Sequence, residues 1–201
     1  MARRAASTPL NMVATVLVTC IVAAGALTLT YEVTRERIIE QERAAERAAL
    51  QAVAPEATEF EQADELLEPA ITAVDKVPVQ AVFRAFGADG TQIGWNVRVA
   101  PRGYAGPVTM VVGLDRFGTV LGVSIITMNE TPGLGTKIVA LPGWIDQFAG
   151  WESTTLDSSL KSFDAIAGAT RSSSAVRNGV AAACQVYNEV LATQEGEASG
   201  S

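Results

Sequence analysis

The sequence predicts an α+β protein: a single N-terminal transmembrane helix and a helical stalk, followed by a domain in which helices flank an antiparallel sheet. Residues 12–31 form an uncharged apolar block, residues 32–53 lack glycine and proline, and residues 77–128 alternate strand-like runs with turns. The boundaries we expect are an N-terminal segment over 1–11, the membrane helix over 12–31, a stalk and acidic linker over 32–76, the domain over 77–192, and a disordered tail over 193–201.

The apolar block at residues 12–31 is about 20 residues long, which is the length that an α-helix needs to cross a bilayer. A cleaved signal peptide is the alternative, because the Ala-Gly-Ala sequence at residues 24–26 resembles a small-residue cleavage site. A lipoprotein signal ending at Cys20 fits less well, since Thr19 stands where a small residue is usual.

Residues 32–53 are rich in Glu, Arg and Ala, which are good helix formers. Opposite charges recur at helical spacing, so we expect ion pairs along a solvated stalk: Glu32–Arg35, Glu40–Arg43 and Arg43–Glu46. Arginines lie on both sides of the membrane block, and their count leaves its orientation open. The next stretch, 55–69, contains acidic but no basic residues and predicts a linker with a short helix near Leu66 and Leu67.

Four strand-like runs follow, separated by glycine-containing turns that predict an antiparallel meander. The runs lie at residues 77–86, 91–100, 107–114 and 119–128. After an irregular loop, residues 142–148 suggest a short helix that carries Trp144. Residues 172–192 predict the last helix, with an apolar face formed by Val176, Val180, Cys184, Tyr187 and Leu191.

Composition excludes several function classes. The net charge of -7 makes the chain a poor partner for nucleic acid, whose phosphates require a basic face. With no histidine and two separated cysteines, the chain lacks the usual ligands of haem, iron–sulfur clusters and zinc, and the base of most hydrolases. We therefore expect no metal site, and an electron carrier of this composition would use an organic cofactor.

The run at residues 164–174 (DAIAGATRSSS) opens the last predicted helix. A helix N-terminus exposes unpaired N–H groups and a partial positive charge, which together bind anions. Thr170 adds a hydroxyl and Arg171 a cation at this point. These residues alone indicate a phosphate-binding helix start, and an ordinary helix cap by Ser172 or Ser173 is the alternative.

Two motifs resemble those of the FMN-binding domain family. The sequence Asp164-x-x-Ala167-Gly168-Ala169-Thr170 resembles the flavinylation motif Asp-x-x-Ser/Thr-Gly-Ala-Thr, with Ala167 in place of the hydroxyl residue. The loop Glu130-Thr-Pro-Gly-Leu-Gly-Thr-Lys137 resembles the second signature, and Gly103-Tyr-Ala-Gly-Pro107 is also similar. With its membrane anchor, the chain resembles the family of G subunits of Rnf electron-transport complexes, most strongly over residues 95–192. It is also similar to the related C subunit of the sodium-translocating quinone reductase.

The resemblance implies FMN attached through its phosphate to Thr170 by a flavin transferase. The cofactor-binding residues it implies are Thr170, Gly168, Ala169, Asp164, Glu130, Thr131, Gly133, Leu134, Gly135, Thr136 and Lys137. Residues 133–135 would pack on the isoalloxazine, and Glu130, Thr131 and Thr136 would offer polar contacts. Lys137 either stabilises reduced flavin or stays solvated, Asp164 either guides the transferase or caps a turn, and Trp144 either lines the site or packs in the core.

The function that the resemblance implies is electron transfer within a membrane-bound, ion-translocating ferredoxin:NAD oxidoreductase complex. The chain would carry electrons without catalysis of its own, and its partners would be the other subunits and the lipid bilayer. We expect it in the bacterial inner membrane, single-pass, with the flavin domain on the periplasmic side. Two alternatives stay open: a component like the C subunit of the quinone reductase, and a membrane-anchored binding or assembly module without a redox role.

Overall fold

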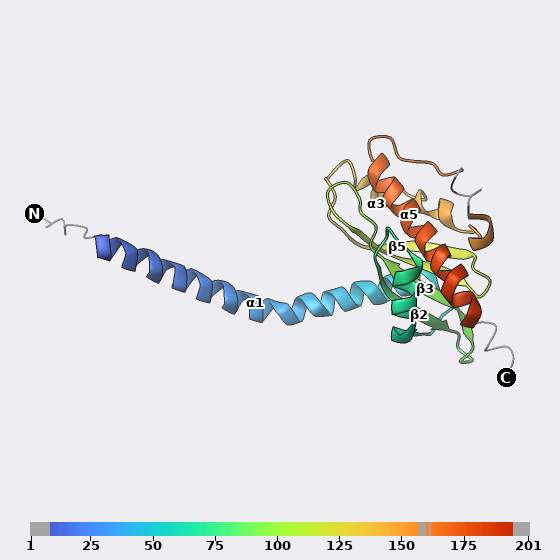
Figure 1. Cartoon of the computed structure of the whole chain (residues 1–201), viewed down its shortest axis with the longest axis horizontal. Helices are drawn as coiled ribbons and strands as arrows, with labels where there is room; N and C mark the ends of the chain where they lie inside the picture. The colour runs from blue at the N-terminus through green and yellow to red at the C-terminus, as the bar shows by residue number, and fades with distance from the viewer. Residues whose placement is uncertain (1–8, 157–159, 161, 195–201) are drawn as a thin grey trace, which may run out of the picture. The chain divides into compact units, whose positions relative to one another are not determined.

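The chain divides into two units, Met1–Ala44 and Ala45–Ser201. The computed structural model describes residues 9–156, 160 and 162–194, so the expected N-terminal segment and disordered tail fall largely outside the described residues. Helix α1 (Pro9–Val53) crosses the boundary between the units (Figure 1). The compact second unit therefore takes in residues that the sequence assigned to the stalk and linker.

Helix α1 runs without a break through the predicted membrane block and the predicted stalk. Of the described residues, one helix is long and apolar enough to cross a membrane, with a mean hydropathy of 2.3 in its apolar stretch. Hydroxyls in this stretch donate to the carbonyl four residues back, as those of Thr15, Thr19 and Thr28 do. These polar side chains are thereby hydrogen-bonded within the helix itself.

The second unit is built on a five-stranded antiparallel sheet of order β1-β2-β3-β4-β5. The strands are β1 (Glu59–Gln62), β2 (Val79–Phe86), β3 (Gln92–Val99), β4 (Val108–Asp115) and β5 (Val120–Met128). Strands β2 to β5 confirm the predicted meander. Strand β1 was not expected, because its residues read as an acidic linker; it pairs with β2, with Glu59 opposite Phe86.

Both faces of the sheet are covered. On one face, Trp95 and Val112 share a buried core with Val176 and Val180 of α5 (Thr170–Val186). On the other face, the end of α1 packs through Leu50 against strands β2 and β4. The Glu46 carboxylate of α1, which we expected beside Arg43, instead pairs with Arg98 of β3.

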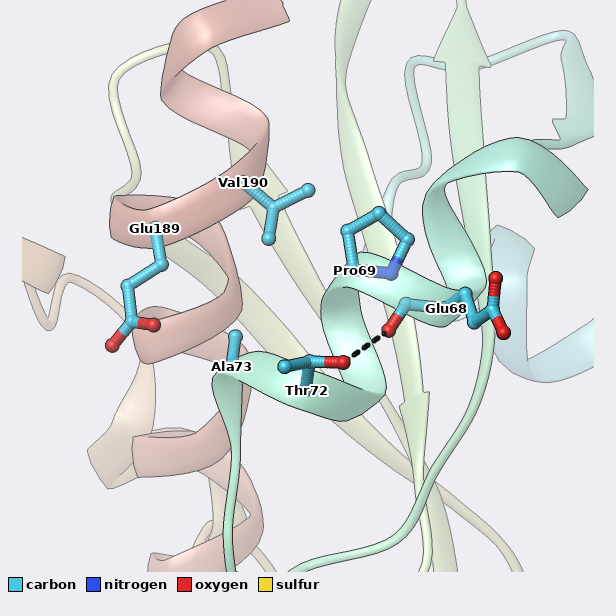
Figure 2. A pocket seen from close by; sticks show the side chains of 6 residues that line it. All are labelled: Glu68, Pro69, Thr72, Ala73, Glu189 and Val190. Carbon is cyan, nitrogen blue, oxygen red and sulfur yellow. Dashed lines mark hydrogen bonds between the residues drawn. The ribbon is translucent and has the colours of Figure 1, made fainter.

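Short helices fill the connections: η1 (Asp64–Leu66), α2 (Leu67–Ala73), α3 (Lys137–Ala140), η2 (Ile145–Phe148) and η3 (Ser153–Thr155). Helices η1 and α2 confirm the short helix predicted near Leu66 and Leu67, whereas η2 is shorter than the helix predicted over 142–148, and Trp144 is its N-cap. Helix α5 continues as a π-helical turn, η4 (Tyr187–Leu191). Figure 2 shows residues of α2 beside residues of η4. A cleft of about 520 Å³ at this place is lined by Glu68, Pro69, Thr72, Ala73, Glu189 and Val190.

The apolar face predicted for the last helix is confirmed. Val176, Val180, Cys184 and Leu191 are fully buried, and Tyr187 is buried as well. The Tyr187 hydroxyl donates to the Arg116 carbonyl oxygen at 2.7 Å. The buried face of α5 and η4 thus packs this helix against the sheet.

Candidate functional site

Three segments that lie far apart in the sequence meet at one pocket of about 270 Å³. They are the loop after β3, the loop after β5 and the turn that leads into α5. The pocket is lined by Tyr104, Leu134, Gly135, Gly168, Ala169, Thr170, Arg171 and Ser172. The structure therefore brings the two sequence motifs together, although Leu134 and Gly168 lie 34 positions apart in the sequence.

Helix α5 begins at Thr170, two residues before the predicted start at residue 172. Of the residues that the structure describes, none caps its first turn with a side chain, and Ala169 occupies the N-cap position. The expected alternative, a cap by Ser172 or Ser173, is wrong, since both serines are buried inside the first turn. The Ser173 hydroxyl oxygen instead accepts the Ile166 N–H at 3.1 Å.

Thr170 itself is exposed at the edge of the pocket. The turn before it bends through Gly168, whose φ of 78° favours glycine. An uncapped first turn, an exposed hydroxyl and the adjacent Arg171 form a site suited to a phosphate group.

The loop after β5 is a series of tight turns. Leu134 N–H donates to the Thr131 carbonyl at 3.2 Å, and Gly133 N–H donates to the Thr136 hydroxyl at 2.9 Å. The Leu134 side chain is 49% exposed at the pocket. Thr131, Gly133 and Thr136 thus shape the loop, and Leu134 and Gly135 are its members that line the pocket.

Two charged residues of this loop bind protein groups around the pocket. Glu130 is buried, and its carboxylate accepts the Tyr104 N–H at 2.8 Å and the Ala105 N–H at 3.4 Å. The Lys137 ammonium group donates to the Ala167 carbonyl at 3.4 Å, next to the turn before Thr170. Both contacts connect segments that the pocket separates.

Asp164 and Trp144 lie outside the pocket lining. The Asp164 N–H donates to Gln147 at 3.0 Å, and its carbonyl accepts the Trp144 indole N–H at 2.9 Å. The Trp144 ring packs edge-on against Phe148, with centroids 5.7 Å apart. Trp144 therefore follows the core-packing interpretation, while it also holds the Asp164 backbone.

Sequence reasoning gave no role to Tyr104, although it noted the Gly-Tyr-Ala-Gly-Pro segment. The Tyr104 side chain is 63% exposed and lies on the pocket, with the Arg171 guanidinium 5.7 Å from its ring centroid. The pocket thus offers apolar and aromatic surface from Leu134 and Tyr104 beside a phosphate-ready helix start. That combination fits FMN, which joins a flat ring system to a phosphate.

Fold and site together define a class: an α+β domain that follows a long apolar helix and has a pocket suited to a phosphate-bearing ring cofactor. Residues 103–185 match the sequence profile of the FMN-binding domain, and this span contains the whole pocket. The chain belongs to the family of G subunits of ion-translocating oxidoreductase complexes. The domain is therefore an FMN-binding domain.

The similarity to individual family members extends beyond the domain. Over 182 residues the chain is 35% identical to the G subunit of the Na(+)-translocating ferredoxin:NAD(+) oxidoreductase complex of Acetobacterium woodii, covering 84% of this chain and 86% of that protein. It is 34% identical over 169 residues to the G subunit of the ion-translocating oxidoreductase complex of Stutzerimonas stutzeri, covering 80% and 73%. The corresponding G subunit of a Vibrio cholerae strain is 35% identical over 139 residues, covering 66% and 65%.

Among solved structures, the chain resembles NqrC of Shewanella oneidensis with a TM-score of 0.47 and 18% identity, over 72% of this chain and 74% of that one.

Proposed function

We propose that this protein is an electron-carrying FMN subunit of a membrane-bound, ion-translocating ferredoxin:NAD oxidoreductase complex, and that it has no catalysis of its own. The observation that carries the proposal is the pocket in which both FMN-family motifs meet beside Thr170. The names of its relatives support the complex, and they make the other subunits its partners. Bound FMN supplies one- or two-electron transfer, while the protein supplies position and electrostatics.

We further propose that Thr170 is the attachment residue, joined to the FMN phosphate as a phosphodiester by a flavin transferase. Its hydroxyl is exposed, and the uncapped amides of α5 and the Arg171 guanidinium lie where a phosphate would be held. Leu134 and Tyr104 would contact the ring, because they are the large side chains of the pocket lining that carry apolar surface. Lys137 would hold the turn at residues 167–168 in place.

Intact-mass measurement tests the attachment. Wild-type protein, co-expressed with a flavin transferase, should carry the mass increment of one FMN, and Thr170→Val should lose it together with in-gel flavin fluorescence. Thr127→Val is the matched control, because Thr127 is an exposed threonine of β5 outside the pocket. Flavin retained on Thr170→Val would place the attachment elsewhere, and wild-type protein without flavin would favour a non-redox module.

We propose that α1 anchors the chain in the bacterial inner membrane as a single span, with the flavin domain in the periplasm. Phe117→Cys provides the test, because Phe117 is 83% exposed in the β4–β5 turn. Intact cells treated with a membrane-impermeant maleimide should label this variant. The wild-type chain is the background control, since Cys184 is buried and Cys20 lies within the apolar stretch. Labelling only after cell lysis would contradict the periplasmic placement.

Membership of the G-subunit family favours ferredoxin:NAD chemistry over the quinone-reductase alternative. Membranes containing the assembled complex should therefore reduce NAD with reduced ferredoxin, and Thr170→Val should reduce this rate. A loss confined to quinone reduction would support the quinone-reductase alternative instead. We propose residues 77–192 as the flavin-binding part of the compact unit, which also contains the end of α1 and strand β1.

A further inference from the structure

A carboxylate is buried directly behind the flavin pocket. Glu130 is 8% exposed, and its two carboxylate oxygens accept two successive backbone N–H groups, those of Tyr104 and Ala105. Burying a carboxylate is costly unless hydrogen bonds compensate for the lost water. Hydrogen bonds from N–H groups to an ionised carboxylate are stronger than neutral ones, so this contact ties the two loops together firmly.

Glycines on both sides make room for this carboxylate. A Cβ atom at Gly103 would overlap Glu130 Oε1, and one at Gly135 would lie 2.5 Å from Glu130 Oε2. The loop closes on itself next to this position, where the Gly103 N–H donates to the Gly106 carbonyl at 2.8 Å. The carboxylate thus occupies a slot between the two loops that only backbones without side chains leave open.

The backbone that Glu130 holds carries the exposed ring of Tyr104. A large aromatic side chain that is 63% exposed at a pocket edge is available to a ligand. Arg171 lies over the same ring and directly follows Thr170 in α5. Tyr104 is therefore placed by one contact behind the pocket and by a second contact within it.

We propose that Tyr104 contacts the isoalloxazine ring of FMN and that Glu130 is the positioning residue that holds Tyr104 there. This inference rests on the proposed function and deepens it. It replaces the direct polar contact to the cofactor that the sequence suggested for Glu130. Glu130 acts through the Tyr104 backbone, so its effect on the flavin depends on the Tyr104 ring.

The first test uses full-length protein in detergent, produced without the flavin transferase. Glu130→Gln keeps the side-chain size but faces one of the two N–H groups with an amide NH₂. Hydrogen exchange should become about tenfold faster or more at the amide, Tyr104 or Ala105, that faces the NH₂ group, because this N–H loses its acceptor. The other amide keeps an acceptor oxygen and should change less. Glu68→Gln, in the separate cleft beside α2, is the control and should leave these two amides unchanged.

Unchanged exchange in Glu130→Gln would overturn the positioning role. Exchange of buried sheet amides such as that of Val112 shows whether the variant is folded. If it is not folded, the Tyr104 variants still decide whether the Tyr104 ring contacts the flavin. Their fold should be intact, because the Tyr104 side chain is exposed.

The second test uses flavinylated full-length protein and measures fluorescence per covalently bound flavin. An aromatic ring in contact with isoalloxazine quenches its emission, so Tyr104→Leu should be brighter than wild type, while Tyr104→Phe stays closer to it. Phe117→Leu, at an exposed turn, is the matched control. Equal brightness of Tyr104→Leu and wild type would overturn the ring contact.

A double-mutant cycle separates positioning from general damage. Glu130→Gln should raise the fluorescence in the wild-type background and should have no further effect in Tyr104→Leu. An equal rise in both backgrounds would show that Glu130 does not act through Tyr104. A missing FMN mass increment in wild-type protein would overturn the proposed function and with it the ring contact, whereas the exchange experiment would still decide the role of Glu130.

Discussion

Gly135 lines the pocket where the loop after β5 packs closely against the first turn of α5. Besides Glu130, a Cβ atom here would meet the Ser172 hydroxyl oxygen at 2.9 Å. Gly135→Ala should therefore lower the free energy of unfolding by about 1–3 kcal/mol through overpacking, and it should reduce the covalently bound flavin per protein. Denaturant unfolding and in-gel fluorescence measure the two effects. Gly25→Ala is the control, because a Cβ at Gly25 has nothing within 4 Å.

Because Cys184 is buried, the free energy of unfolding should decrease at alkaline pH. Burial raises the pKa of its thiol to about 12, from 9.0 in an unfolded chain. Between these values the unfolded chain loses the proton first, so stability is fully present below pH 9 and falls as the pH rises. The slope should approach about 1.4 kcal/mol per pH unit.

Chemical unfolding of wild type and Cys184→Ala at several pH values measures this contribution. Other groups titrate in the same range, so the quantity compared is the difference in unfolding free energy between the two proteins. That difference should shrink steadily above pH 9. A difference that stays constant to pH 11 would show that the thiol ionises equally in both states.

Single residues also show what the sequence could and could not predict about the site. Thr170 and Leu134 belong to local motifs, and local motifs are readable in a single sequence. The contact between Glu130 and the Tyr104 N–H joins residues 26 positions apart. It depends on how β3, β4 and β5 place their loops, and no short-range spacing encodes that.

The end of α1 lies on strand β4 at a glycine, and this contact fixes the second layer of the domain. A Cβ atom at Gly113 would meet the carbonyl oxygen and the Cβ of Val53, both at 2.9 Å. Gly113→Ala should lower the free energy of unfolding by about 1–3 kcal/mol, since the helix end must move off the strand. Thermal or urea unfolding in detergent measures the change.

Gly122→Ala is the matched control for this contact. Gly122 pairs with Gly113 across the β4–β5 ladder, yet its Cβ would lie 3.7 Å from the Val53 Cα, an ordinary contact distance. A smaller loss is expected there. Equal losses in the two variants would mean that the effect comes from the strand and not from α1.

Strand β1 and the start of α5 are two places where the observed elements differ from those that the sequence predicts. The four longer strands carry enough alternation to be recognised, but β1 has four residues, two of them Glu, and gains its pairing from β2. Helix α5 starts early because Ser172 and Ser173 are buried against the domain rather than used as caps. In both cases tertiary contacts override the local preference.

At the scale of the whole molecule, the compact unit extends further toward the N-terminus than the charge pattern of the stalk suggests. The charges of the stalk are so regular that its last turns read as solvated, although Ala49, Leu50 and Val53 are buried on the sheet. The compact unit accordingly begins at Ala45, inside α1. Helix α1 therefore runs without a break from the apolar stretch into the compact unit, and its last turns belong to the core of that unit.

Two truncations test this organisation. A chain beginning at Ala45 keeps the packed end of α1 and should fold cooperatively without detergent. A chain beginning at Ala54 loses Leu50 and Val53, whose burial contributes about 1.5–3 kcal/mol each, and also loses the Glu46 partner of Arg98. It should unfold at clearly lower urea concentration and bind a dye for exposed apolar surface. Equal midpoints for the two chains would show that the end of α1 only rests on the sheet, and the compact unit would then begin after the helix.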